Sequence, residues 1–122
     1  MTAKLEVSVG QCSTQGMKAD NQDTVGFFIP SKLALLETKG VACAIADGLS
    51  SSNEAKQASQ ACVTGFMSDY FSTPDSWSVK QSGSKVLAAI NTWLHGQSQQ
   101  FQQAGRGMAS TFSAVVVKST TA

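Results

Sequence analysis

The stretch "VACAIADGLSSSNEAKQAS", residues 41–59, constrains the fold more than any other part of the chain. Residues 41–46 are apolar at every position, which is typical of a central strand covered on both faces. This predicted strand stops abruptly at Asp47 and Gly48. A carboxylate at the mouth of a buried strand is costly to desolvate unless a backbone amide, a basic side chain or a metal ion pairs with it. Taken alone, an Asp-Gly pair is more typical of a plain turn after a strand.

The remaining hydrophobic pattern predicts one domain that mixes strands and helices. Alternation of Leu5, Val7 and Val9 with polar residues predicts a half-buried strand over 5–9, and residues 24–29 predict a second strand. Apolar residues at three- and four-residue steps predict helices over 53–71 and 79–101, and residues 112–117 predict a last strand. The pattern does not decide the conformation of the connection 31–39. The predicted order is β-β-β-α-α-β, an α+β fold over residues 1–122.

This order predicts a sheet with one bare face. The first three strands are joined by loops, so we expect antiparallel neighbours. Two amphipathic helices can cover only one side of such a sheet. The strands 41–46 and 112–117 are apolar on both faces, which would leave a contiguous apolar patch on the other side. We therefore expect the chain to self-associate as a dimer, either sheet against sheet or by exchange of elements.

Composition excludes several classes of function. A net charge of +1 over 122 residues gives no electrostatic basis for binding nucleic acid or a membrane surface. No apolar run approaches the roughly 20 residues of a membrane-spanning helix, and residues 1–5 lack the features of a signal peptide. Three cysteines without a C-x-x-C pair favour reduced thiols in or near the core of a cytoplasmic protein. A lone His95 cannot form a metal cluster by itself, and Ser50, Ser51 and Ser52 lack a G-x-S-x-G context.

Three separated stretches of the sequence form one pattern. They contain Gly16, Lys18, Asn21, Gln22 and Asp23, then Ala46, Asp47, Gly48 and Leu49, then Ala58 and Ser59, and finally Met108 and Thr111. Together these stretches resemble a known family, the metal-dependent serine/threonine phosphatases of the protein phosphatase 2C type. That family carries G-x-x-R-x-x-N-E-D before its second strand, V-A-D-G-M-G-G and then G-E-x-A-S at its third strand and first helix, and M-G-T-T after two helices. Order, spacing and element type agree.

The resemblance implies a two-metal hydrolase that removes phosphate from phosphoserine and phosphothreonine in a phosphoprotein substrate. Members hold two Mg²⁺ or Mn²⁺ ions, hard cations that prefer oxygen ligands. By resemblance, Asp47 would bridge the two ions and Gly48 would offer its carbonyl, its missing Cβ leaving room for the ion. Asp23 would be a metal ligand or lie close to one, Gln22 would reach a metal through water, and Lys18 would bind the substrate phosphate. Asp47 and Asp23 are thus the candidate catalytic residues.

The sequence also departs from the family pattern. Lys18 replaces an arginine and loses its bidentate fork, and Gln22 replaces a glutamate and loses its charge. Ser50 and Ser51 replace two glycines. These changes leave open a second function, a non-catalytic phosphatase-like module that binds proteins. The family's domain is a β-sandwich of two sheets whose later strands and metal aspartates are not in this sequence. We therefore expect a truncated amino-terminal part of one domain, inactive when isolated.

Overall fold

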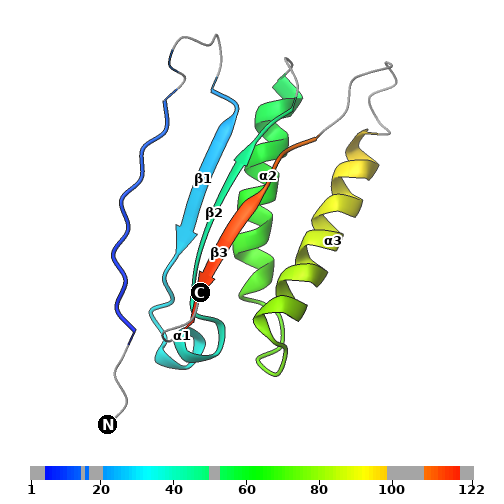
Figure 1. Cartoon of the computed structure of the whole chain (residues 1–122). Coiled ribbons are helices and arrows are strands. Elements are labelled where there is room, and N and C mark those ends of the chain that lie inside the picture. The colour runs from blue at the N-terminus through cyan, green and yellow to red at the C-terminus, as the bar shows by residue number, and fades with distance from the viewer. Residues whose placement is uncertain (1–4, 15, 17–20, 50–52, 99–108, 119–122) are drawn as a thin grey trace.

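The computed structural model describes residues 5–14, 16, 21–49, 53–98 and 109–118. Within them the elements are β1 (Asp23–Phe28), α1 (Leu33–Lys39), β2 (Val41–Asp47), α2 (Asn53–Tyr70), α3 (Val79–Ser98) and β3 (Ser113–Val117). The strands form one antiparallel sheet in the order β1-β2-β3 (Figure 1). The predicted α+β class, the antiparallel pairing of the second and third predicted strands, and the central position of residues 41–46 are confirmed.

The predicted strand over residues 5–9 is wrong. These residues are extended in Figure 1 but belong to no strand of the sheet. Alternation fixes which side chains share a face, whereas a strand also requires backbone pairing with a neighbour. The predicted alternation is nevertheless present, because Leu5, Val7 and Val9 are half-buried and the residues between them are exposed.

The connection that the sequence left undecided contains helix α1. Leu36 of this helix is buried in the core. The helix ends at Gly40, whose N–H donates to the Leu36 carbonyl over 2.9 Å and whose φ is +75°. An L-residue rarely adopts that backbone conformation, so glycine permits the turn from α1 into β2.

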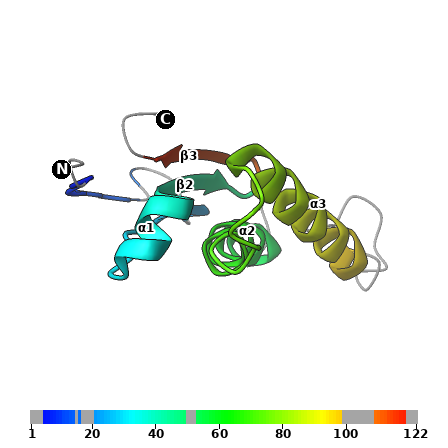
Figure 2. The ribbon, with the colours of Figure 1, turned by 90° about the horizontal axis from the view of Figure 1, so that it is seen from below.

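Helix α2 packs against the sheet through small side chains. Figure 2 shows α1 and α2 below the sheet and α3 beside α2. The side chains of β2 that face α2 are alanines, Ala42, Ala44 and Ala46. Helix α2 contributes Ala55 and Ala58, which are fully buried. Small residues on both surfaces allow a close approach of backbone to backbone. The rest of this core cluster comes from α2 and α3, namely Cys62, Val63, Phe66, Tyr70, Val86, Ile90 and Leu94.

Helix α3 packs against α2 through one narrow stripe. Val86, Ile90 and Leu94 recur at four-residue steps and are buried, as the periodicity predicts. Leu87 and Trp93, which the same pattern assigned to the apolar face, are 40% and 48% exposed. The predicted helix end at Phe101 lies outside the described residues.

The opposite face of the sheet carries no helix within the described part of the chain. Ile45 lies opposite Val25 on one side and Ser113 on the other, and Cys43 lies opposite Val115. Ile45 and Val115 are each 54% exposed. The predicted bare apolar face is therefore present, while the predicted self-association remains a prediction.

The three free cysteines differ in exposure and should differ in reactivity. Cys12 is exposed, Cys43 is half-buried and Cys62 is buried. Burial raises the pKa of the Cys62 thiol, and a hydrogen bond with Ser110 offsets this only in part. Because the thiolate is the reactive form, we expect Cys12 to be alkylated first and Cys62 last at neutral pH. Mass spectrometry of peptides after timed iodoacetamide exposure measures the order, and early labelling of Cys62 would contradict the packing of α2.

Candidate functional site

Two carboxylates meet at one end of the sheet. Asp23 begins β1, Asp47 ends β2, and the two residues lie directly opposite each other across the ladder. The buried alanines of β2 face the helices, so the alternation of the strand puts Asp47 and its partner on the bare face. Side chains directly opposite each other on antiparallel strands have Cβ atoms about 4.5–5.5 Å apart, and like charges there repel. A cation at this end would relieve the repulsion.

The residues before β1 are held by hydrogen bonds. The Asn21 carboxamide oxygen accepts from the Asp23 N–H over 3.1 Å, and its amide group donates to the Ser13 hydroxyl over 2.8 Å. The Gln22 carbonyl accepts from the Gly48 N–H over 3.2 Å. The Asn-Gln-Asp stretch is thereby fixed against the Asp-Gly stretch, although most of β1, helix α1 and most of β2 separate them in the sequence.

The third stretch reaches the same end through β3. The Thr111 N–H donates to the Asp47 carbonyl over 2.9 Å, and the Thr111 hydroxyl accepts from the Asp47 N–H over 3.0 Å. The Ser110 hydroxyl donates to the Asp47 carbonyl over 3.2 Å. The Leu49 N–H donates to the Ala109 carbonyl over 2.9 Å. Both backbone groups of Asp47 are therefore engaged, which fixes the direction in which its carboxylate leaves the strand.

Gly48 is required by packing as well as by any role in binding. A Cβ built on Gly48 would collide with the backbone carbonyl of Ala55 and would lie 2.8 Å from the Ala55 Cα. The first turn of α2 thus occupies the space that the sequence interpretation reserved for an ion. The glycine brings the start of α2 against the end of β2, and a role for its carbonyl stays a prediction.

Two residues of α2 contact β1 near this site. The Lys56 ammonium donates to the Asp23 carbonyl over 2.7 Å. Nothing in the sequence pattern predicted this contact of Lys56. Ser59 is fully buried, and its hydroxyl hydrogen bonds with that of Thr24 over 2.8 Å. The Ala58-Ser59 pair that carried part of the resemblance therefore joins α2 to the sheet.

Some of the predicted site residues lie close together in the structure, and others are not among the described residues. Asp23, Asp47, Gly48 and Gln22 gather at one end of the sheet with Thr111. Lys18, Ser50, Ser51 and Met108 lie outside the described residues, so the phosphate-binding role of Lys18 stays a prediction.

The gathered groups offer oxygen ligands, which suit Mg²⁺ or Mn²⁺ better than softer metals. Within the described residues, no group of three or more histidine, cysteine, aspartate or glutamate side chains could hold a metal ion. Two opposed carboxylates are thus part of a ligand set. None of the described helices is both long enough and apolar enough to cross a membrane.

In comparisons with known proteins, no family model, no curated protein and no solved structure matches the chain.

Proposed function

We propose that this chain is the amino-terminal part of a metal-dependent phosphoprotein phosphatase of the protein phosphatase 2C type. The observation that supports it is the convergence of three separated sequence stretches on one end of the sheet. Asp23 and Asp47 face each other there, and the backbones of Gln22, Gly48 and Thr111 hold them in register. The resemblance to the family rests on the same three stretches.

The residues divide the work of the proposed reaction. Asp47 and Asp23 supply negative oxygens that hold divalent cations, and the hydrogen bonds from Thr111 and Ser110 to Asp47 keep its backbone in place. Gly48 would add a carbonyl, Gln22 a water-mediated contact and Lys18 a positive charge for the phosphate. Two bound Mg²⁺ or Mn²⁺ ions would supply an activated water for hydrolysis of a phosphoserine or phosphothreonine ester. Further carboxylates would be needed to complete the ligand set.

The second candidate function is a phosphatase-like module that binds proteins without catalysis. It is favoured by the bare apolar face around Ile45 and Val115, together with the incomplete set of ligands among the described residues. The two functions differ in one property, the binding of Mn²⁺ between the two carboxylates.

We expect Mn²⁺ to bind the purified chain and Asp47→Asn to weaken that binding by about tenfold or more, since one of two charged ligands is lost. Isothermal titration calorimetry measures the affinity. Asp69→Asn is the matched control, because Asp69 is an exposed aspartate on α2 far along the helix from Asn53. In a protein that carries the complete domain, Asp47→Ala should abolish turnover of p-nitrophenyl phosphate.

A thermal melt of Asp23→Asn separates the metal site from a simple structural role. Without metal, this variant should be more stable than the wild type by roughly 0.2–1 kcal/mol, because a like-charge pair is removed. With Mn²⁺, the order should reverse, because a cation that binds only the folded wild type raises its melting temperature. If Mn²⁺ shifts neither melt, the metal site is wrong and the binding module is the better function.

A further inference from the structure

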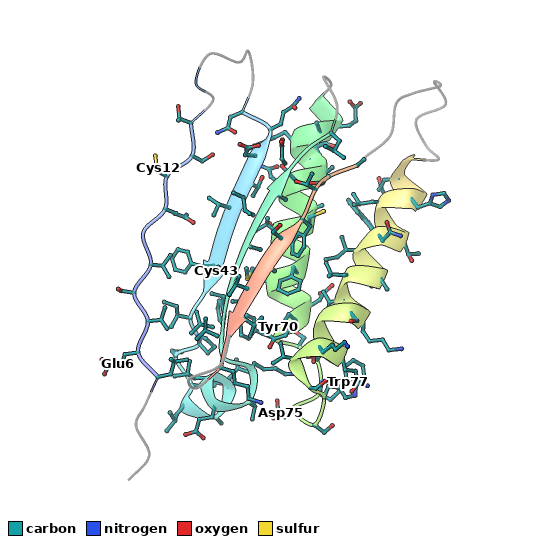
Figure 3. The ribbon with its side chains drawn as sticks, in the orientation of Figure 1. Glu6, Cys12, Cys43, Tyr70, Asp75 and Trp77 are labelled. Carbon is teal, nitrogen blue, oxygen red and sulfur yellow. The ribbon has the colours of Figure 1, made fainter. Side chains whose placement is uncertain are left out.

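An apolar groove runs between the sheet and the last helix. It has a volume of about 490 Å³, with Phe66 and Tyr70 of α2 at its base, Val79 and Leu87 of α3 on one side and Ala114 and Val116 of β3 on the other. Figure 1 shows α3 standing beyond the edge of β3, and Figure 3 shows Tyr70 in the space between them. The groove is thus an opening beside an edge strand.

Within the described sheet, the edge of β3 that borders this groove has no partner strand. The Thr111 N–H donates to the Asp47 carbonyl of β2, and the same register pairs Val115 with Cys43. The odd-numbered residues of β3 therefore direct their backbone groups toward β2. Alternate residues of an antiparallel strand point their N–H and C=O groups to opposite edges. Ala114 and Val116 therefore direct theirs away from β2, and no other strand of the described sheet pairs with them.

The other edge of the sheet has a charged contact at the start of β1. At β1, the Lys56 ammonium engages the outward carbonyl of Asp23. Charged side chains at an edge are a common means of preventing further pairing. The edge of β3 instead borders an apolar groove, so an extended segment could pair with the backbone and bury alternate apolar side chains at once.

We propose that the groove and the edge of β3 bind the extended segment 5–10 of a second copy of this chain. In the sequence "LEVSVG", Leu5, Val7 and Val9 alternate with exposed polar residues, as required of a strand with one buried face. The segment is extended but has no strand partner in its own sheet. Pairing with β3 would supply the backbone partners that both the segment and the edge lack.

Opposite charge favours the encounter of this segment with helix α3. Helix α3 carries Lys80, which lines the groove, and Lys85, and its sequence contains no acidic residue. The segment carries Glu6 and no basic residue, and Figure 3 shows Glu6 projecting from the extended chain. Opposite charges favour the encounter of two such surfaces. Reciprocal binding of each segment in the partner's groove would close the assembly as a dimer.

Ala114→Pro tests the edge directly. Proline removes the outward N–H of residue 114 without removing a hydrogen bond between β2 and β3, and proline is tolerated on edge strands. Light scattering during size-exclusion chromatography should find the wild type as a dimer and this variant as a monomer at the same micromolar concentration, a loss of affinity of about tenfold or more. Ser113→Ala is the matched control, because residue 113 directs its backbone toward β2, and it should remain a dimer.

Val7→Asp tests the segment and leaves β3 unchanged. This variant should also be a monomer, because a carboxylate would be buried in an apolar groove. Mixing Val7→Asp with Ala114→Pro should restore part of the dimer, since one intact segment then meets one intact groove. A monomeric wild type would overturn the proposal. It would also be overturned if Ala114→Pro and Val7→Asp remained dimers and the further change Ile45→Ser dissociated them, because the interface would then be the bare sheet face. None of these results depends on Mn²⁺, so the proposed phosphatase function can fail independently.

Discussion

Replacing Gly48 with alanine is expected to lower the free energy of unfolding by about 3 kcal/mol, the upper part of the range for overpacked sites. The added Cβ would collide with the Ala55 carbonyl, and a backbone group cannot rotate away as a flexible side chain can. To make room, the start of α2 would have to move from the end of β2. That movement would also disturb the hydrogen bond between the Gly48 N–H and the Gln22 carbonyl.

Chemical denaturation at one protein concentration measures this change, with Gly83→Ala as the control. A Cβ at Gly83 would meet nothing within 4 Å, and the residue lies inside α3. There alanine should raise the stability by up to about 1 kcal/mol, because it favours the helix over the unfolded chain. Because the two substitutions should change the stability in opposite directions, the comparison distinguishes a steric requirement at Gly48 from a general effect of replacing glycine. Equal stability of Gly48→Ala and the wild type would show that α2 does not approach β2 so closely.

The sequence predicted the elements better than their contacts. Apolar spacing located α2 and α3 because the buried residues, such as Ala58, Cys62 and Phe66, recur at the helical period. It also predicted the central strand and its bare face. The strand over 5–9 was wrong because alternation describes a face, whereas strand formation depends on an edge that offers hydrogen bonds in register.

The candidate site was predictable in outline only. The order of the three stretches, read as a resemblance, indicated that Asp23 and Asp47 belong together. Their placement opposite each other depends on the register of β1 with β2, and the two strands are joined by a connection whose conformation the pattern left undecided. The contact of Lys56 with the Asp23 carbonyl could not be predicted, because a solvent-facing lysine on a helix has the same pattern in the sequence.

Lys39 is buried although lysine is normally exposed, and its replacement should destabilise the fold as much as that of Gly48. Its side chain is fully buried, and its ammonium donates to the Thr73 hydroxyl over 2.6 Å, the Pro74 carbonyl over 2.9 Å and the Ser82 hydroxyl over 3.0 Å. The ammonium also lies 5.6 Å from the centre of the Tyr70 ring. These contacts join the end of α1 to the turn between α2 and α3, at the end of the sheet opposite Asp47.

Lys39→Ala should lower the free energy of unfolding by about 3 kcal/mol, since it leaves a cavity and removes the donor for three acceptors, of which the Ser82 hydroxyl is buried. Lys39→Met keeps most of the apolar stem and removes only the donor, so its loss should be smaller, about 1–2 kcal/mol. Lys32→Met is the control, because Lys32 is exposed beside the same helix and its replacement should change stability by less than about 0.5 kcal/mol.

The pH dependence of stability tests whether the buried group is charged. Burial lowers the pKa of Lys39 below its ordinary 10.5, the nearby Asp75 offsets this in part, and Lys118 adds to it. Between the lowered pKa and 10.5 the unfolded chain binds more protons than the folded chain, so stability rises with pH in that window. Burial raises the pKa of Tyr70, which acts in the opposite direction in both proteins. The stability of the wild type minus that of Lys39→Met should therefore increase as the pH approaches 10.5 from below. If this difference in stability does not change with pH, and if the wild type and Lys39→Met are equally stable at neutral pH, the ammonium does not hold the turn between α2 and α3 against α1.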